Sequence, residues 1–481
     1  MALQRVAVIG AGAAGLCAAR HILSRPNSFA RPVVFELTDN IGGTWCYDER
    51  VGNYDNGRPV HSSMYRDLRT NLPKEVMMFP DFPFDPQLSS FLPHQEVQRY
   101  LERYCHSHNI RPHIRFNTAV ENVRPVVEEE TTTWEVTSCD SSGGQKTETF
   151  DSVFVCSGHY SDPHIPDIPG VENFKGEVLH SHSYRYAEPF SGQSVVVLGA
   201  KASGLDISIE LAKVGAQVTL SHGRPRLTFP LPSGIQQSSP VVAVQDDGSV
   251  RFQDGSVGRA DVLMFCTGYN FRYTFLDADQ LSLEIQDHMV SPLYRFLTPP
   301  AFPSLFFIGI CKIICPFPNF DCQEEENRQI QEREDTTKGK MKLKSQRQQQ
   351  ETSICSGSYP QVLKTWLLPQ LSICQESNVQ FALAVLDGSV SLPSRAEMED
   401  EVRRELQEKV ERGVQRRHLL IMEKDQWEYC RTLAHAAGFP PLPPVVRSLY
   451  EEVWRQRQIH PQSYRSLNYR LISDTQWELI D

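Results

Sequence analysis

Two short apolar stretches, each followed by a glycine-rich turn and a helical pattern, predict an α/β fold with two dinucleotide-binding domains of the Rossmann type. The first stretch and its turn cover residues 5–15, and the second cover residues 194–204. The composition, 40% hydrophobic and 22% charged over 481 residues, is typical of a globular chain with several domains. The formal net charge of −11 argues against a general nucleic-acid binder.

The first turn has the full Gly-x-Gly-x-x-Gly pattern, formed by Gly10, Gly12 and Gly15. In this pattern the first glycine allows a tight turn, and the second lets a pyrophosphate approach the backbone at a helix N-terminus. The third glycine lets the helix pack closely on the strand. The next expected strand, residues 32–36, ends in Glu36. This carboxylate follows the last glycine by about 20 residues, the spacing at which it accepts hydrogen bonds from a ribose.

The second turn departs from this pattern at its middle position. Gly199 and Gly204 are in place, but Lys201 stands where the second glycine is expected. A side chain there hinders the close approach of a pyrophosphate, whereas an ammonium group can pair with a phosphate as a point charge, and the sequence leaves both interpretations open. The strand expected over residues 217–221 ends without an acid and is followed by Arg224. This combination favours NADPH over NADH, although a solvated basic loop is the plainer interpretation.

Apolar runs and turn signals place the other elements of the two units. The expected helix covers residues 94–105, the expected hairpins lie around residues 134–150 and 249–253, and the expected buried strands cover residues 152–158, 261–269 and 305–309.

The composition changes sharply over residues 323–352, which are nearly all Glu, Gln, Lys, Arg and Thr and therefore typical of disorder. Helical periodicity resumes at residues 379–386, and a capping box at Ser394 opens a long charged helix expected to reach His418. We expect residues 323–378 to be either a disordered loop or an unspliced intron retained in a conceptual translation.

The sequence has no run of about 18 apolar residues, so we expect no membrane span. Its 12 cysteines form no C-x-x-C pair, a usage typical of reduced thiols in the cytoplasm rather than of a disulfide framework or a metal site. Cys311 and Cys315 lie in an apolar stretch, where we expect them to pack in the core.

One further stretch lies between the two turns. Residues 174–185 match the pattern F-x-G-x-x-x-H-x-x-x-Y-R, with His180 and Tyr184 at two of its fixed positions. This pattern resembles the identifying motif of the flavin-containing monooxygenases. Other stretches that resemble sequences of the same family are Gly42–Trp45, Thr70–Asn71, 77–84, 266–269 and 292–295. The resemblance covers residues 1–322 and 379–450, and is greatest to soluble eukaryotic members, including thioether- and thiol-oxidising types.

The resemblance implies that the first turn holds FAD and the second holds NADPH. NADPH would reduce the flavin, O2 would add to form a C4a-hydroperoxide, and a soft nitrogen or sulfur nucleophile of a small substrate would attack the distal oxygen. Asn71 would be the catalytic residue beside the flavin and nicotinamide, while His180 and Tyr184 would be structural. The expected cofactor-binding residues are Gly10, Gly12, Ala13, Ala14, Gly15, Glu36, Gly43, Thr44, Trp45, Thr70, Asn71, Val120, Gly199, Lys201, Ser203, Gly204 and Arg224.

The resemblance also implies a division of the chain. The expected parts are a first part of the FAD-binding domain (1–165), an NADPH-binding domain (166–270), a return to the FAD domain (271–322), the insert (323–378) and a C-terminal helical part of the FAD domain (379–481). We further expect a homodimer without a nucleic-acid partner.

Three other functions share part of this plan. A Baeyer–Villiger monooxygenase uses the same flavin chemistry on ketones. A flavin disulfide reductase needs a redox cysteine pair near the flavin, yet the next cysteine after Cys46 in the sequence is Cys105. A catalytically impaired sensor that still binds FAD and NADP is favoured mainly by Lys201.

Overall fold

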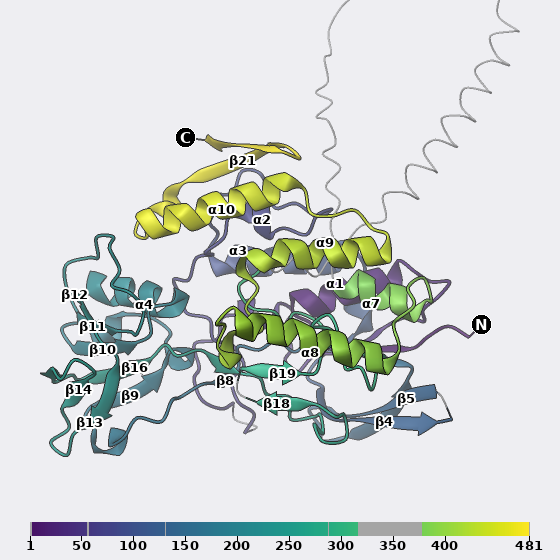
Figure 1. The fold of residues 1–481 in the computed structure, drawn as a ribbon, viewed down its shortest axis with the longest axis horizontal. Helices are drawn as coiled ribbons and strands as arrows, with labels where there is room; N and C mark the ends of the chain where they lie inside the picture. The colour runs from purple at the N-terminus through teal and green to yellow at the C-terminus, as the bar shows by residue number, and fades with distance from the viewer. Residues whose placement is uncertain (1, 55–56, 130, 287, 316–377, 481) are drawn as a thin grey trace, which may run out of the picture.

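The computed structural model describes residues 2–54, 57–129, 131–286, 288–315 and 378–480. Figure 1 shows a teal unit, built around β10, beside a larger unit that combines the purple N-terminal segments with the green and yellow C-terminal helices. The predicted insert lies outside the described residues except for Asn378, which is fully buried as the first residue of a helix.

The larger unit is built on a five-stranded sheet with the order β20-β7-β1-β2-β3. Every neighbouring pair is parallel, and β1 pairs with both β2 and β7. Parallel sheets are covered on both faces, which explains why these strands are continuous apolar runs. The strands are β1 (Val6–Ile9), β2 (Val33–Phe35), β3 (Ile114–Arg115), β7 (Ser152–Val155) and β20 (Leu305–Phe307).

The teal unit repeats this plan with the strand order β12-β11-β10-β16-β9, again all parallel. Its strands are β9 (Glu177–His180), β10 (Ser194–Leu198), β11 (Gln217–Ser221), β12 (Ile235–Ser238) and β16 (Val262–Phe265). Strand β20, which follows it in the sequence, returns to the first sheet. The two Rossmann-type units expected from the sequence are therefore confirmed, while the domain boundaries themselves stay predictions.

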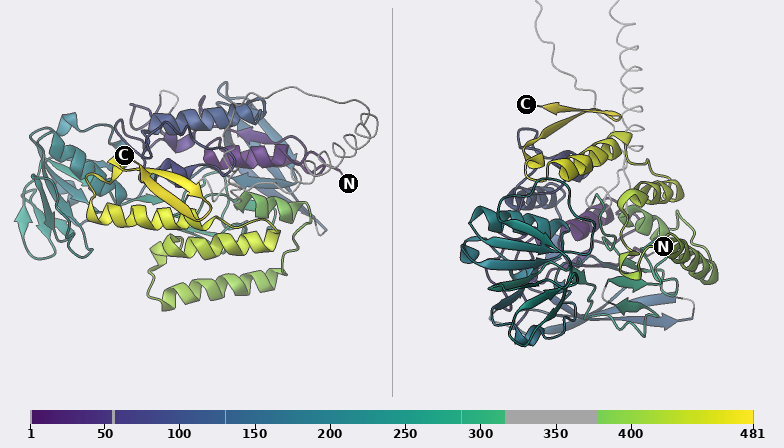
Figure 2. Two further views of the ribbon diagram at one scale, coloured as in Figure 1. Left: turned by 90° about the horizontal axis from the view of Figure 1, so that it is seen from above. Right: turned by 60° about the vertical axis from the view of Figure 1, so that its left-hand side comes forward.

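Helices cover both sheets. Figure 2, from above, shows the green and yellow C-terminal helices alongside the purple and blue N-terminal ones. In the larger unit α1 packs against both α3 and α7, and α7 packs against α9. The helices are α1 (Ala13–Leu23), α2 (Lys74–Met77), α3 (His94–Ser107), α4 (Ala202–Lys213), α7 (Asn378–Leu386), α8 (Arg395–Glu411), α9 (Gln426–Ala437) and α10 (Pro444–Ile459).

The long charged helix is shorter than the sequence predicted. Its capping box between Ser394 and Glu397 is present, but α8 ends at Glu411 rather than near His418. Gly413 follows with a φ of +80°, a left-handed conformation that ends helices. A separate 3₁₀ turn then covers Arg416–His418.

Antiparallel hairpins complete the two units. Two of these hairpins lie where turn signals in the sequence predicted them, around residues 134–150 and 249–253. The three-stranded sheets are β4 (Ala119–Glu128), β5 (Thr131–Cys139) and β6 (Gln145–Phe150), and β13 (Val241–Val244), β14 (Val250–Phe252) and β15 (Val257–Gly258). The two-stranded pairs are β8 (Asp162–Pro163) with β17 (Tyr269–Asn270), β18 (Glu284–Gln286) with β19 (Met289–Ser291), and β21 (Asn468–Ser473) with β22 (Gln476–Ile480).

Each unit has its own hydrophobic core. One core joins the first sheet to the C-terminal helices, while two smaller clusters cover the two faces of the second sheet. Cys311 and Cys315 lie in the first core, 4% and 1% exposed, as the sequence predicted. No helix in the parts of the chain that the structure describes is long and apolar enough to cross a membrane.

Candidate active site

The first glycine turn is a tight cradle at the end of β1. Gly10 has a φ of +107°, and a Cβ added there would lie 2.6 Å from the carbonyl oxygen of Cys156. A Cβ on Gly15 would lie 1.8 Å from the carbonyl oxygen of Gly10. Gly12 is the N-cap of α1 and has no side chain with which to cap the first N–H groups, those of Ala13 and Ala14. The turn therefore presents helix N–H donors to an anion.

Glu36 closes one side of this cradle. It is 6% exposed, and its Oε2 accepts a hydrogen bond of 2.8 Å from the N–H of Ala11. Its Oε1 accepts from the N–H and the hydroxyl of Thr38, at 2.9 and 2.8 Å. The N–H of Thr118 donates to the Glu36 carbonyl oxygen at 2.9 Å, which brings the start of β4, with Val120, to the same side. The carboxylate is thus fixed at the sheet edge where a ribose is expected.

The loop with Gly43, Thr44 and Trp45 lies against the same turn. The N–H of Gly42 donates to the carbonyl oxygen of Ala11 at 3.1 Å. A Cβ on Gly43 would lie 3.1 Å from the Cα of Gly12. Two glycine backbones therefore face each other, and this narrow, donor-rich cradle with a carboxylate at its rim fits a dinucleotide.

The second turn repeats this backbone. Gly199 has a φ of +108°, and an added Cβ would lie 2.6 Å from the carbonyl oxygen of Cys266. A Cβ on Gly204 would lie 1.8 Å from the carbonyl oxygen of Gly199. Lys201 is the N-cap of α4 and is exposed, as is Ser203 in the first turn of the helix. The lysine therefore stands at the open mouth of this turn.

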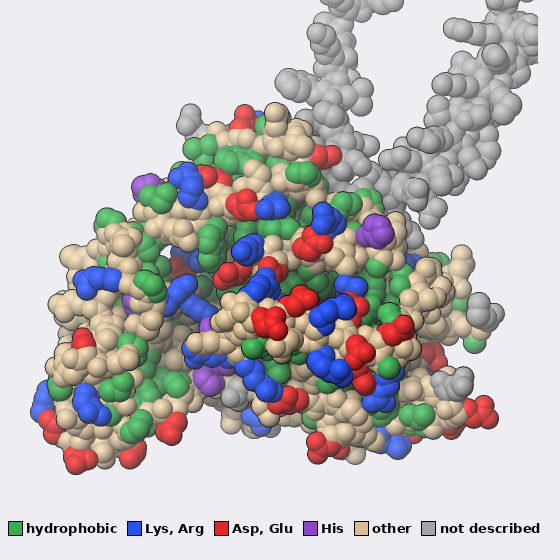
Figure 3. Space-filling model, in the orientation of Figure 1, with side chains coloured by type: hydrophobic (Ala, Val, Ile, Leu, Met, Phe, Trp, Pro, Cys, Tyr) green, Lys and Arg blue, Asp and Glu red, His purple; other side chains and the backbone are tan. Residues whose placement is uncertain are grey.

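Basic side chains surround Lys201. Although the Lys201 side chain is largely exposed, the protein around it partly desolvates its amine, and this desolvation together with the nearby Arg224 and Arg417 lowers the pKa of the amine. Burial and Lys201 lower the pKa of Lys312 to about 8. Burial and the same lysine lower the pKa of His418 to about 4. Figure 3 shows Lys, Arg and His side chains gathered at the junction between the teal unit and α8. His418 is therefore neutral near pH 7, whereas Lys201, Lys312 and the two arginines make this junction positively charged and able to attract an anion.

The sequence analysis missed the part of this group that comes from distant segments. The N–H of Lys312 donates to the carbonyl oxygen of Leu420 at 2.8 Å, and the N–H of Met422 donates to that of Lys312 at 2.9 Å. These bonds hold the segment with Arg417 and His418 beside Lys312. No local motif marks these residues, because about a hundred positions separate them in the chain.

His222 is a second residue that the sequence analysis missed. In the first sheet Ile9 pairs with Phe35, the residue before Glu36. In the second sheet Leu198 pairs with Ser221, so His222 occupies the place of the acid. Its side chain is 9% exposed, and its Nε2 lies 3.2 Å from Gln237 Oε1. Aligning the two glycine turns and counting along the strands that follow them would have identified His222 from the sequence.

Asn71 lies in the loop that precedes α2 and is half-buried. The preceding Thr70 is 2% exposed, and its N–H donates to the carbonyl oxygen of Leu92 at 2.8 Å. The Thr70 hydroxyl accepts a hydrogen bond of 3.0 Å from the N–H of Leu92. Within the described ranges the side-chain amide of Asn71 has no recorded hydrogen-bond partner. These two bonds of Thr70 anchor the loop that carries Asn71.

Residues 3–228 match the family described as flavin-binding monooxygenase-like. The flavin-containing monooxygenase FMO GS-OX4 of Arabidopsis thaliana is 33% identical over 474 residues, which cover 95% of this chain and 87% of that protein. The chain belongs to the flavin-containing monooxygenase family. Like other members it is an FAD- and NADPH-dependent monooxygenase, as the sequence predicted.

Two solved structures are similar to this chain over nearly its whole length. The S-allyl-L-cysteine S-oxygenase of Allium sativum has a TM-score of 0.77 and 32% identity, with 96% of this chain and 95% of that chain covered. Tmm from Pelagibacter sp. strain HTCC7211 has a TM-score of 0.76 and 26% identity, with 99% and 96% covered.

The identifying motif of the flavin-containing monooxygenases has a structural role here. Arg185 is 5% exposed, and its guanidinium donates to the carbonyl oxygens of Asp48 at 2.6 Å and Ser62 at 3.2 Å. The hydroxyl of Tyr184 donates to Glu210 at 2.8 Å, so the motif also contacts α4. His180 Nδ1 accepts a hydrogen bond of 3.0 Å from the N–H of His182. The motif therefore ties the linker to both units of this monooxygenase.

Cys46 lies near the first turn but has the wrong environment for a redox thiol. Its Sγ donates to the carbonyl oxygen of Ile41 at 3.1 Å. Burial and the neighbouring Glu36 raise the pKa of the Cys46 thiol to about 12. A disulfide reductase needs a reactive thiolate, which this environment disfavours.

Proposed function

We propose that this monooxygenase transfers one oxygen atom to the sulfur of a small thioether. The observation that carries the proposal is its likeness, over 96% of the chain and at a TM-score of 0.77, to an S-allyl-L-cysteine S-oxygenase. The Arabidopsis relative has a GS-OX name and is similar over 95% of the chain. Thioethers are soft nucleophiles and match the substrate class expected from the sequence.

We propose that the first turn holds FAD, with Glu36 on the ribose and the Gly43 loop over the pyrophosphate. The second turn holds NADPH, with Lys201 as a phosphate partner. The proposal is supported by the exposure of Lys201 and by the cations Arg224 and Arg417 beside it. His222, in place of an acid, leaves the 2′-phosphate without a repelling carboxylate.

Bound FAD supplies the redox chemistry with O2. The balanced reaction takes NADPH, a proton, O2 and the thioether to NADP+, water and the sulfoxide. The protein orients the reactants and excludes water. Asn71 positions the reacting groups through its amide, which can donate to an oxygen and accept from a carboxamide.

The test supplies the FAD-loaded enzyme with NADPH, oxygen and one of three probes: S-allyl-L-cysteine, a small tertiary amine or cyclohexanone. We expect substrate-dependent NADPH oxidation and a sulfoxide product, identified by mass spectrometry, with the thioether alone. An amine oxide without a sulfoxide would move the function to nitrogen oxygenation. A lactone would support the Baeyer–Villiger alternative instead.

We also propose that the enzyme works as a homodimer in the cytoplasm. Buried thiols such as Cys17, Cys156 and Cys266 fit a reducing compartment. Light scattering after size-exclusion chromatography of the FAD-loaded chain tests the dimer, which a mass of one chain would contradict.

A further inference from the structure

The C-terminal segment that follows α10 and runs into the first residues of β21 contacts both nucleotide-binding units. On the second unit, Gln462 Nε2 donates to the carbonyl oxygen of Pro230 at 2.9 Å. On the first unit, Asn468 Oδ1 accepts from the N–H of Ser90 at 3.0 Å. The N–H of Tyr469 donates to the hydroxyl of Ser90 at 2.8 Å. This segment, residues 462–469, is therefore a strap across the junction of the two units.

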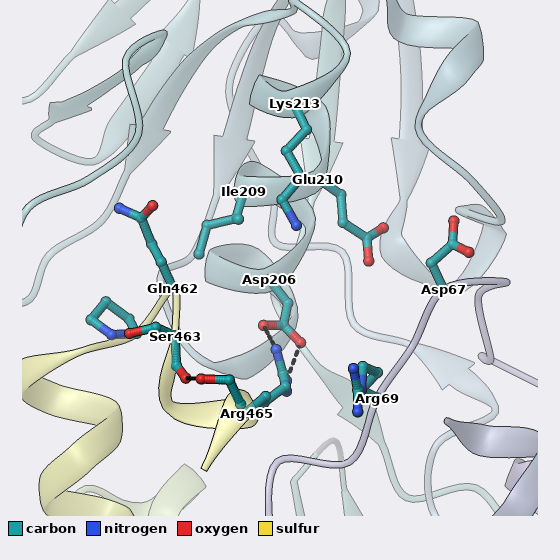
Figure 4. Close-up of a pocket in the computed structure, with 11 residues that line it drawn as sticks. Asp67, Arg69, Asp206, Ile209, Glu210, Lys213, Gln462, Ser463 and Arg465 are labelled. Carbon is teal, nitrogen blue, oxygen red and sulfur yellow. Dashed lines mark hydrogen bonds and ion pairs between the residues drawn. The ribbon is translucent and has the colours of Figure 1, made fainter. Parts of the chain in front are cut away.

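Arg465 lies at the centre of the strap and reaches both units with one guanidinium. Its Nη1 and Nη2 form a two-pronged ion pair with the carboxylate of Asp206 on α4, at 2.8 and 2.6 Å. Its Nε donates to the carbonyl oxygen of Thr70 at 3.0 Å. Figure 4 shows the pair bordering a pocket of about 360 Å³ between α4 and the strap. The two charged side chains are 21% and 22% exposed, so water screens them only partly.

The two partners of Arg465 stand next to the proposed machinery. Thr70 directly precedes Asn71, whose amide is the proposed contact to the reacting groups. Asp206 lies two residues after Gly204, in the helix whose N-terminus is the proposed site of the NADPH phosphates. Asp206 is itself held, because the hydroxyl of Tyr65 donates to its Oδ2 at 3.1 Å.

We propose that Arg465 is a positioning residue that fixes the NADPH-binding helix α4 relative to Asn71. A guanidinium suits this role because its planar fork makes several directed hydrogen bonds at once, which an ammonium group cannot do. Arg465 acts through Thr70 and Asp206 and touches neither cofactor nor substrate. The inference rests on the proposed roles of Asn71 and the second turn, but not on the thioether as substrate.

Contacts that do not involve Arg465 also attach the strap to the first unit. Tyr464 is 3% exposed, and its ring meets that of Phe91 edge to face at 5.2 Å. The bonds of Asn468 and Tyr469 to Ser90 are independent of the guanidinium. Removing the arginine side chain should therefore loosen the junction rather than unfold the chain.

The test compares the FAD-loaded wild type with Arg465→Met, Asp206→Asn and the double variant. We expect each single variant to raise the NADP+ dissociation constant about tenfold by calorimetry, because small misplacements of positioned groups are costly. The double variant is expected to match the single ones, because all three break the same contact. More of the NADPH should be spent on forming hydrogen peroxide, by the balance NADPH, H+ and O2 to NADP+ and H2O2.

Two further variants separate positioning from folding. Arg465→Lys keeps the charge but not the fork, and should restore NADP+ binding only in part. Arg470→Met breaks an exposed pair with Glu478 on the adjacent hairpin, where N and O are 2.9 Å apart, and should leave NADP+ binding unchanged. The proposal is overturned if Arg465→Met and Asp206→Asn lower Tm and FAD content while the NADP+ dissociation constant stays near wild type. A wild type that binds NADP+ but leaves thioethers unoxidised contradicts only the proposed function.

Discussion

The first glycine turn, residues 10–15, and the second, residues 199–204, share one backbone and differ in their surroundings. The φ angles of Gly10 and Gly199 are +107° and +108°. The N–H of Gly10 donates to Phe35, and that of Gly199 to Ser221, both at 2.8 Å. The middle glycine of the first turn faces another glycine backbone, whereas the middle position of the second is an exposed lysine.

The difference extends along the two helices that follow. Position for position from the glycines, Asp206 of α4 corresponds to Cys17 of α1, which is fully buried. Glu210 corresponds to His21, which is 2% exposed. Helix α1 packs against α3 and α7, while α4 turns charged residues toward the strap. Backbone geometry therefore sets what both turns can bind, and the neighbours set how firmly each turn is enclosed.

The largest expected effects come from substitutions that disrupt one glycine turn at a time. Gly15→Ala and Gly204→Ala both place a Cβ 1.8 Å from a backbone oxygen, and each should cost at least about 3 kcal/mol of folding free energy. Gly15→Ala should abolish FAD loading, measured by flavin absorbance, because it disrupts the first core. Gly204→Ala should abolish NADP+ binding and retain FAD, because the second unit has its own core. Gly223→Ala, with 3.4 Å to a proline side-chain carbon, is the mild control.

The next effect concerns cofactor choice. His222→Glu places in the second unit the carboxylate that the first unit carries as Glu36. Repulsion of the 2′-phosphate should lower the ratio of kcat/KM for NADPH to that for NADH about 30-fold. His222→Gln adds no charge and should keep the NADPH preference. An unchanged ratio in the glutamate variant would place the 2′-phosphate elsewhere.

A smaller effect decides between the two interpretations of Lys201. Lys201→Gly and Lys201→Met both remove a phosphate partner, and each should weaken NADP+ binding about fivefold and flatten its salt dependence. Calorimetry at several ionic strengths measures both quantities. Tighter binding by the glycine variant alone would show that side-chain bulk, rather than lost charge, governs this turn.

The smallest effect is a pH dependence of stability that originates at Glu210 on α4. Burial raises the pKa of Glu210 from 4.5 to about 7. Because the folded state binds this proton more tightly than the unfolded state, stability is greatest below pH 4.5 and is lost as the pH rises through about 7. Glu210→Gln should therefore gain about 1 kcal/mol over the wild type at pH 8.5 and little at pH 5. Tm values measured across this range would contradict the prediction if the difference stayed constant.

Both turns, the strands that lead into them and Glu36 could be predicted from the amino-acid sequence, because these features depend on residues close together in the chain. Where a backbone contact five residues away requires a glycine, that glycine appears in a short sequence pattern. A buried parallel strand likewise appears as a continuous apolar run. The identifying motif over residues 174–185 is local in the same way, and it was enough to indicate the family.

Which distant residues share a site could be seen only in the folded chain. His222 needed the strand register, and the end of α8 at Glu411 needed the left-handed backbone of Gly413. Arg465 and Asp206 are 259 positions apart, and their contact exists because the C-terminal strap folds back over α4. Such contacts follow from the packing of whole units, which leaves no periodic or local signal in the chain.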